Sequence, residues 1–241
     1  MGILNPRDLE ILNFIARFGY VQERHLAILW DLSLVQIKRV VSKLAEYGYV
    51  VSTKVLSGSG NYVFLTATSG KMLDVKTPSR VNLNTLFHDT LLVDLYFFLI
   101  NNDALTPEII KTDKQLRKEF GIFDVNSKQR VPDLLIDDKI AIELELSEKP
   151  KTRLQEIINT YIIDNDIKLV CYFLQSVSLL NKISAMTLGN QKYRFYLFEV
   201  DKNMQFIKLQ QQISSGLVDI QKLNLMQLPD AAPKRFGNYQ F

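Results

Sequence analysis

Three carboxylates lie within an otherwise apolar stretch of the chain, residues 131–149. Asp133 follows a proline, and Glu143 and Glu145 stand two residues apart in a run of isoleucine and leucine. Side chains alternate between the two faces of a strand, so we expect both glutamates on one face. Carboxylates in apolar surroundings are costly unless a cation compensates them. Three converging acids would supply the oxygen ligands that Mg²⁺ or Mn²⁺ binds, with positions left for water and phosphate.

A β-hairpin would bring these acids together. The apolar runs 134–136 and 140–146 flank an Asp-Asp-Lys turn, which is the pattern of a hairpin. Asp133, at the start of the first strand, would then reach the glutamates on the second. The alternative is that Asp133 only ends a turn and that the glutamates pair with basic residues on a solvated sheet face. Those basic residues would be Lys149, Lys151 and Arg153.

The composition is that of an ordinary globular protein. Of 241 residues, 47% are hydrophobic and 23% are charged, which provides enough apolar material for a core. The single cysteine, Cys171, excludes disulfides within the chain and cysteine zinc sites. No apolar run reaches the length of a membrane span, and the N-terminus lacks the pattern of a signal peptide. We therefore expect a cytoplasmic protein with no membrane partner.

The net positive charge is confined to the N-terminal third. Residues 1–76 contain nine Lys/Arg and six Asp/Glu, whereas the remainder contains 20 of each. Thr68 is expected to cap a short closing helix of this part. A proline and several polar residues then interrupt the apolar periodicity at 75–82. We therefore expect two domains, residues 1–76 and 83–228, followed by a C-terminal tail at 229–241.

The N-terminal third has the order of elements of a winged helix-turn-helix. Apolar residues at helical spacing predict helices at 6–18, 23–30 and 34–47. Two strands, 49–56 and 61–66, then flank a Ser-Gly-Ser-Gly turn and would form the wing. Three helices followed by a glycine-rich hairpin are typical of a DNA-binding domain, although some winged helices serve protein contacts instead.

The third predicted helix presents a polar face that suits DNA. Gln36, Arg39 and Lys43 lie on this face, with Ser42 beside them. A recognition helix enters the major groove, where Gln and Arg contact base edges and Lys reaches phosphates. Lys54, on the first wing strand, is a further candidate for DNA contact. For an isolated helix a solvated polar face would be the simpler reading, but the order of elements favours DNA binding.

The remaining two-thirds predict an α/β sandwich around one mixed sheet, because helices and apolar strands alternate around the hairpin. The expected helices span 83–101, 113–120, 151–165 and 177–186. The expected strands besides the hairpin span 108–112, 167–174 and 195–200.

Several motifs together resemble a known nuclease superfamily. An Asp after a proline and a Glu ten residues later, with an acidic helix ahead of them, resemble the PD-(D/E)xK superfamily, which has the restriction-endonuclease-like fold. Within that superfamily, the chain is similar to the replication–relaxation family, which includes the C-type plasmid mobilisation relaxases. The motifs that carry this resemblance are Pro132-Asp133, the segment 142–147, Lys149, Arg153 and Tyr161, together with His88-Asp89 and Val93-Asp94.

The resemblance implies roles for individual residues. Asp133 and Glu143 would take the metal-binding positions for Mg²⁺ or Mn²⁺. Glu145 stands where the superfamily has a lysine, so it would add a metal ligand rather than stabilise the phosphate's charge. A lysine at the end of the strand, Lys149 or Lys151, would reach in instead. The accessory residues from neighbouring helices would be His88, Asp89 and Tyr161, although the apolar spacing around Tyr161 better suits a core residue.

Two functions follow as hypotheses. The first is a plasmid mobilisation relaxase that binds double-stranded DNA at the origin of transfer and nicks or processes it by metal-dependent phosphodiester chemistry, assisted by an accessory mobilisation protein. The alternative is a non-catalytic replication or transfer regulator, with a winged helix on a degenerate nuclease fold. The histidine cluster of common relaxases is excluded, because the chain has only His25 and His88, in different expected domains.

Overall fold

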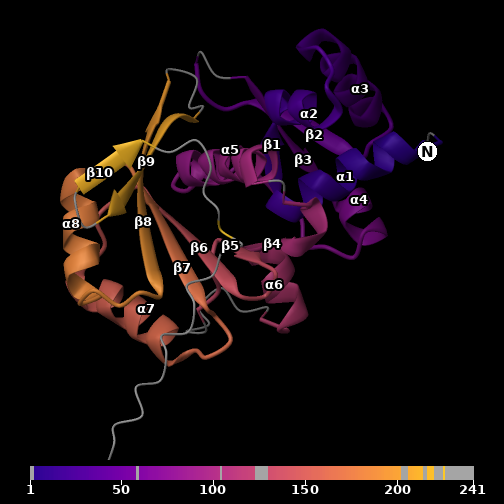
Figure 1. The fold of residues 1–241 in the computed structure, drawn as a ribbon. Coiled ribbons are helices and arrows are strands. Elements are labelled where there is room, and N and C mark those ends of the chain that lie inside the picture. The colour runs from indigo at the N-terminus through magenta and orange to yellow at the C-terminus, as the bar shows by residue number, and fades with distance from the viewer. Residues whose placement is uncertain are drawn as a thin grey trace, which may run out of the picture.

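The computed structural model describes most of the chain (Figure 1). The described residues are 3–57, 60–103, 105–122, 130–201, 206–213, 216–219 and 225, with the side chains of 102, 103 and 207 left aside. The predicted fold class is confirmed: a winged helix-turn-helix precedes an α/β sandwich with a mixed central sheet. None of the helices among these residues is long and apolar enough to cross a membrane. The predicted tail, 229–241, lies outside the described residues.

The winged helix has three strands that form one antiparallel sheet in the order β1-β3-β2. The first strand is only three residues long, too short for periodicity to predict it. The second and third strands form the predicted wing hairpin, in which Val50 pairs with Leu65 and Lys54 pairs with Asn61. In chain order the elements are α1 (Pro6–Phe18), β1 (Tyr20–Gln22), α2 (Glu23–Trp30), α3 (Leu34–Glu46), β2 (Val50–Lys54), β3 (Asn61–Leu65) and α4 (Ala67–Met72).

Capping residues account for the helix ends in this part. The Asn5 side chain accepts from the backbone of Asp8, and the Asp8 side chain accepts from the backbone of Asn5, which closes a capping box at the start of α1. Gly19 ends α1 at φ 86°, a backbone conformation that favours glycine. The predicted cap of α4 was wrong by two residues, because Thr66 caps this helix and Thr68 lies inside it.

The second part is built on a seven-stranded sheet in the order β10-β9-β8-β7-β6-β5-β4. Strands β6, β7 and β8 are parallel to one another, and the outer pairs are antiparallel. In chain order the elements are α5 (Leu86–Asp103), a 3₁₀ turn (Pro107–Ile109), β4 (Ile110–Thr112), α6 (Asp113–Glu119), β5 (Leu134–Ile136), β6 (Ile140–Glu145), α7 (Lys151–Ile163), β7 (Leu169–Leu174), α8 (Val177–Met186), β8 (Tyr193–Val200), β9 (Phe206–Ile213) and β10 (Gly216–Asp219).

Helices cover both faces of the large sheet (Figure 1). The predicted alternation along β6 is confirmed. Ile140, Ile142 and Leu144 face α5, whereas Ala141 belongs to the cluster beneath α7 and α8. Because β6 is buried along its whole length, the face that carries its glutamates is covered rather than solvated.

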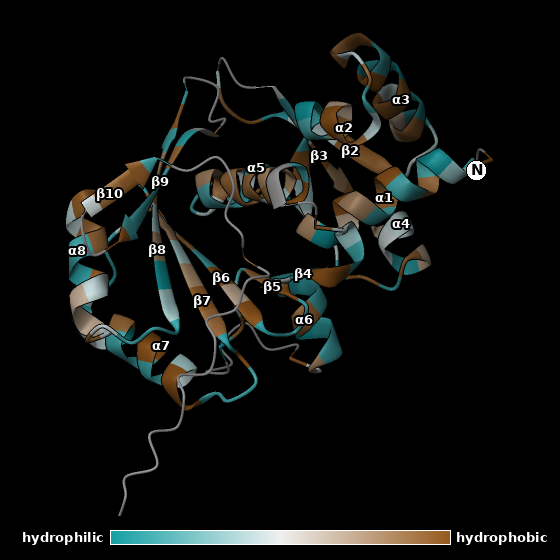
Figure 2. Cartoon of the chain, viewed as in Figure 1, coloured by the Kyte–Doolittle hydropathy of each residue, from teal (hydrophilic) through white to brown (hydrophobic). Residues whose placement is uncertain are grey.

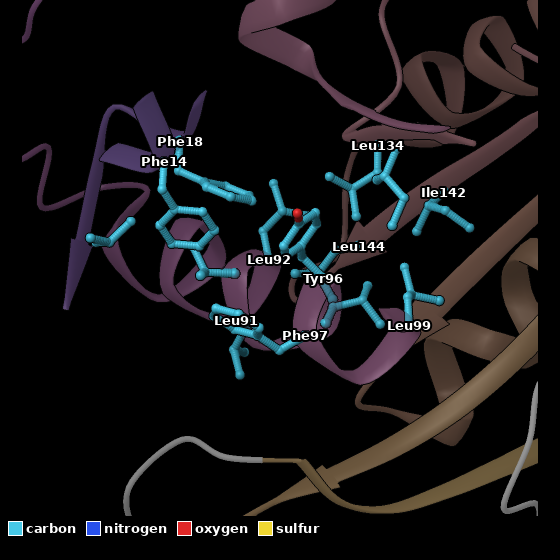
Figure 3. Packing of buried hydrophobic residues seen from close by; sticks show 14 of the residues in the cluster. Phe14, Phe18, Leu91, Leu92, Tyr96, Phe97, Leu99, Leu134, Ile142 and Leu144 are labelled. Atoms are coloured by element: carbon cyan, nitrogen blue, oxygen red, sulfur yellow. The ribbon is translucent and has the colours of Figure 1, made fainter. Parts of the chain in front are cut away.

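Helix α5 lies between the large sheet and the winged helix. Apolar residues occur on all its sides, as expected of a helix that packs in two directions, and Figure 2 shows them along its visible length. Toward the sheet it contacts Leu134, Ile142 and Leu144, and toward α1 its Tyr96 packs on Phe14 (Figure 3). One apolar cluster therefore continues from the winged helix into the sheet.

Candidate functional site

The hairpin of β5 and β6 brings the predicted acids to the same region. Leu134 pairs with Ile142 in antiparallel register, so Asp133, one residue earlier, lies beside Glu143, one residue later. On the other side of β6, Glu143 stands in register with Tyr172 of β7. This much agrees with the spacing in the sequence.

Asp133 is held by the backbone of the next strand and by a histidine. The backbone N–H of Leu144 donates to Asp133 Oδ2 at 2.8 Å, and His88 Nε2 lies 3.3 Å from the same oxygen and 3.1 Å from the Leu144 carbonyl. His88 Nδ1 lies 3.2 Å from Asp89 Oδ1. Burial lowers the pKa of His88, but hydrogen bonds and charges of Asp133 and Asp89 outweigh it and raise the pKa to about 10. His88 is therefore an imidazolium that donates from both nitrogens.

Asp133 is ionised as a result. Burial alone would raise its pKa, but the hydrogen bond and charge of His88 and the Leu144 N–H hold the pKa of Asp133 below its ordinary value. The sequence placed His88 and Asp89 as helix residues approaching the site. His88 contacts Asp133 directly, whereas Asp89 contacts His88 on the side away from the sheet.

Glu143 is fully buried and has a partner on each oxygen. Arg130 forms an ion pair with Oε2, and the Tyr161 hydroxyl donates to Oε1. Burial raises the pKa of Glu143 to about 7, against the opposing charge of Arg130. Burial likewise raises the pKa of Tyr161 well above its ordinary range, so the tyrosine is a neutral donor. It packs in the cluster beneath α7, in agreement with the core role that its spacing indicated.

Glu145, only 3% exposed, pairs with Lys149 four residues later. This ion pair is the one that the alternative reading of the sequence anticipated, except that it forms on a covered face. Lys151 is exposed at the start of α7 and forms no ion pair with the acids in the part of the chain that the structure describes. Each of the three acids thus has its own cation: His88 for Asp133, Arg130 for Glu143, and Lys149 for Glu145.

This arrangement does not fit a divalent cation. Among the described residues, no group of three or more His, Cys, Asp and Glu is placed to hold a metal ion. A metal needs free carboxylate oxygens, whereas both oxygens of Glu143 and the Oδ2 atom of Asp133 are occupied by donors from the protein. Binding of Mg²⁺ or Mn²⁺ at Asp133, Glu143 and Glu145 therefore stays a prediction that would require these pairs to open.

Polar contacts connect the site to the winged helix. The Tyr20 hydroxyl of β1 donates to Asp89 Oδ2, which also accepts from Thr85 Oγ1 at 2.7 Å. Through Asp89 and His88 the chain of contacts runs from β1 to Asp133.

A second link joins α2 to α5 through Asp94. Both guanidinium Nη atoms of Arg24 contact its carboxylate, with Nη2–Oδ2 at 2.6 Å, and His25 Nε2 lies 3.2 Å from Oδ1. His25 is fully buried, and burial lowers its pKa. Because His25 Nδ1 accepts from the Gln22 N–H at 3.1 Å, its proton lies on Nε2 and is donated to Asp94.

The structure separates the predicted DNA-contacting residues into two groups. Arg39 and Ser42 are exposed on α3, and Lys54 is exposed at the end of β2, as predicted. Gln36 is exposed too, but its Oε1 accepts from Ser33 N and Oγ, both at 2.9 Å, and so caps α3. Lys43 donates to the buried Asp8 at 2.6 Å. Gln36 and Lys43 are thus bound to other residues of the protein, which makes them less available to contact DNA.

Several residues of these sites received no role from the sequence, and Asp94 was named only as part of a motif. Lys38 could have been found, because a lysine beside the buried stripe of Ile37, Val41 and Leu44 is expected to extend its charged end into solvent. Arg130, His25 and Asp94 gave no local signal as partners, because their contacts depend on how separate elements pack.

The raised pKa of His88 predicts that its contribution to stability depends on pH. Its folded value of about 10 exceeds its ordinary value of 6.5, so the stabilisation by imidazolium is complete below pH 6.5 and is lost as the pH rises toward 10. The difference in unfolding free energy between wild type and His88→Gln should shrink across this window in urea titrations. His25→Gln is the control, since His25 is neutral throughout that range. A constant His88 difference would contradict the assigned imidazolium.

Comparisons with known proteins assign no family to this chain. Neither a family model nor a curated protein matches it. Among solved structures, it is similar to the transcriptional regulator Tm0710 from Thermotoga maritima, with 14% sequence identity and a TM-score of 0.26. The similarity covers 52% of this chain and 80% of the regulator. A TM-score this low supports no conclusion about shared fold or function.

Proposed function

We propose that this protein binds duplex DNA through α3 and the wing of β2 and β3. The observation that carries the proposal is the exposed basic face of α3, the second helix of the helix-turn-helix, on which Lys38 and Arg39 stand side by side. Helix α3 packs against α2 and β2 and lies at the end of the molecule away from the large sheet (Figure 1). Its open face is therefore accessible to a groove of DNA.

Charge supports the same proposal. The excess of three positive charges lies within residues 1–76, and phosphate contacts by Lys and Arg supply most of the affinity of a protein for DNA. Lys54 extends the basic surface from α3 to the wing. This distribution of charge favours DNA binding over a role in protein contacts alone.

Removing the two exposed cations should weaken DNA binding strongly. We expect the double variant Lys38→Ala/Arg39→Ala to bind random-sequence duplex at least about tenfold more weakly, with a salt dependence reduced by roughly two phosphate equivalents. Fluorescence anisotropy over a series of salt concentrations measures both quantities. Lys71→Ala, which removes an exposed charge from α4, is the matched control and should bind like wild type.

Lys43 is unsuitable for this test because its removal would leave the buried Asp8 without its cation. If the double variant and wild type bind equally at low salt, or if neither binds, the proposed interface is wrong.

For the second domain, we favour the non-catalytic alternative. The pairing of Asp133, Glu143 and Glu145 with His88, Arg130 and Lys149 supports a nuclease-like fold that holds the winged helix rather than one that cuts DNA. Relaxase activity at an origin of transfer, with or without an accessory mobilisation protein, is the competing proposal.

A plasmid nicking assay separates these two proposals. We expect wild type to relax supercoiled plasmid in Mn²⁺ or Mg²⁺ no faster than Asp133→Ala does, because the acids are already compensated. Faster nicking by wild type would overturn the non-catalytic proposal, and nicking confined to DNA that carries an origin of transfer would support the relaxase.

A further inference from the structure

Contacts within the protein limit which side chains of α3 can read DNA. Gln36 accepts from the backbone and side chain of Ser33, and Lys43 donates to Asp8. The apolar face of the helix is buried; it consists of Ile37, Val41 and Leu44. The set left free is therefore smaller than the polar pattern of the sequence suggests.

The free side chains form a stripe along the helix. Val35, Arg39, Ser42 and Glu46 follow one another at intervals of four, three and four residues, which places them on one side of α3. Together with the two lysines of α3 they line a shallow hollow on the surface. Val35, at the N-terminal end, is 61% exposed, although it is an apolar residue.

The chemistry of this stripe suits base edges in the major groove. An arginine contacts guanine O6 and N7 with two hydrogen bonds, and a small apolar side chain packs on the methyl group of thymine. Recognition helices contact bases mainly with their N-terminal residues, which here include Val35 and Arg39. Phosphate contacts fix the position of a protein on DNA but carry no sequence information, so an exposed valine, which cannot bind a phosphate, points to contact with a base.

We propose, on the basis of the proposed function, that Arg39 and Val35 determine sequence preference by reading a guanine and a nearby thymine. Four residues of helix span about 6 Å, which corresponds to roughly two base-pair steps. The preferred site therefore holds its guanine and thymine within about two steps. Lys38 and Lys54 contact phosphates and add affinity without preference.

The test begins with selection of preferred duplexes from a random-sequence library by wild-type protein. In the selected duplex, each guanine is replaced by 7-deazaguanine, which lacks the N7 acceptor, and each thymine by uracil, which lacks the methyl group. Binding of each substituted duplex is then measured for wild type, Arg39→Ala, Val35→Ala and Lys38→Ala. Thermal unfolding of each variant confirms that it is folded.

We expect wild type to lose about fivefold or more at one guanine and a smaller factor at a thymine within two steps of it. Arg39→Ala should be insensitive to the guanine substitution, and Val35→Ala to the thymine substitution. Lys38→Ala should bind every duplex more weakly by one common factor and keep both preferences.

Two results would overturn the inference while the proposed function stands. One is a wild-type protein that binds DNA but selects no sequence. The other is an Arg39→Ala variant that keeps the guanine preference of wild type. Absence of any binding to DNA would overturn the proposed function and this inference together.

Discussion

Glu143→Ala is expected to lower the free energy of unfolding by about 3 kcal/mol, because it removes the counter-ion of Arg130 from a buried pair. The Arg130 side chain is 22% exposed, so water compensates the loss only in part. Tyr161, which donates to Glu143, would also lose its acceptor. Urea unfolding measures the effect, and we expect the slope of the unfolding free energy against urea concentration to be the same in wild type and variant.

Two further variants identify its cause. Glu143→Gln keeps the volume and an acceptor for Tyr161 but removes the charge, so we expect an intermediate loss. Tyr161→Phe removes only the hydroxyl and should cost about 1 kcal/mol. If Glu143→Ala unfolds at the same urea concentration as wild type, the ion pair with Arg130 does not form.

The same variant distinguishes an ion pair from a metal site. A ligand that binds only the folded state stabilises it in proportion to the logarithm of its concentration. We expect added Mg²⁺ to change the stability of wild type and Glu143→Ala equally. A stabilisation by Mg²⁺ in wild type that is lost in Glu143→Ala would show that the carboxylate binds the metal.

Asp94→Ala is expected to have a comparable effect, about 3–5 kcal/mol, because two donors would lose their common acceptor. The Asp94 side chain is only 7% exposed, and its carboxylate accepts hydrogen bonds from both Arg24 and His25. Since these residues join α2 to α5, we also expect faster proteolysis in the irregular segment 73–85 between the two parts.

A double-mutant cycle with Arg24→Ala measures the contribution of the pair itself. The coupling energy between Arg24 and Asp94 should exceed about 1 kcal/mol, since the pair is largely shielded from water. Glu10→Ala, which removes an exposed acid from α1, is the control and should change stability by less than about 0.5 kcal/mol. A coupling near zero would mean that this ion pair does not help to hold the winged helix on α5, and that apolar packing and other contacts, such as Tyr20 with Asp89, do so instead.

Much of the fold follows from local patterns in the sequence. Helical periodicity and capping residues place α1, α2 and α3 within about one residue, and the long apolar run at 83–101 corresponds to α5 with a shift of a few residues. Strands β9 and β10 were not predicted. Three consecutive glutamines in β9 break the apolar alternation, so its side chains do not indicate a strand. Backbone pairing with β8 and β10 places it in the sheet.

The sequence by itself determined which residues share a face, because alternation along a strand is a local property. It therefore placed Glu143 and Glu145 together and Asp133 beside them. The sequence also anticipated the pair of Glu145 with Lys149, four positions away. Only the tertiary structure decided which cations meet Asp133, Glu143 and Asp94. Arg130 lies 13 positions from Glu143, His88 lies 45 from Asp133, and Arg24 lies 70 from Asp94. Such contacts depend on how helices pack against the sheet, and no residue spacing within one element encodes that.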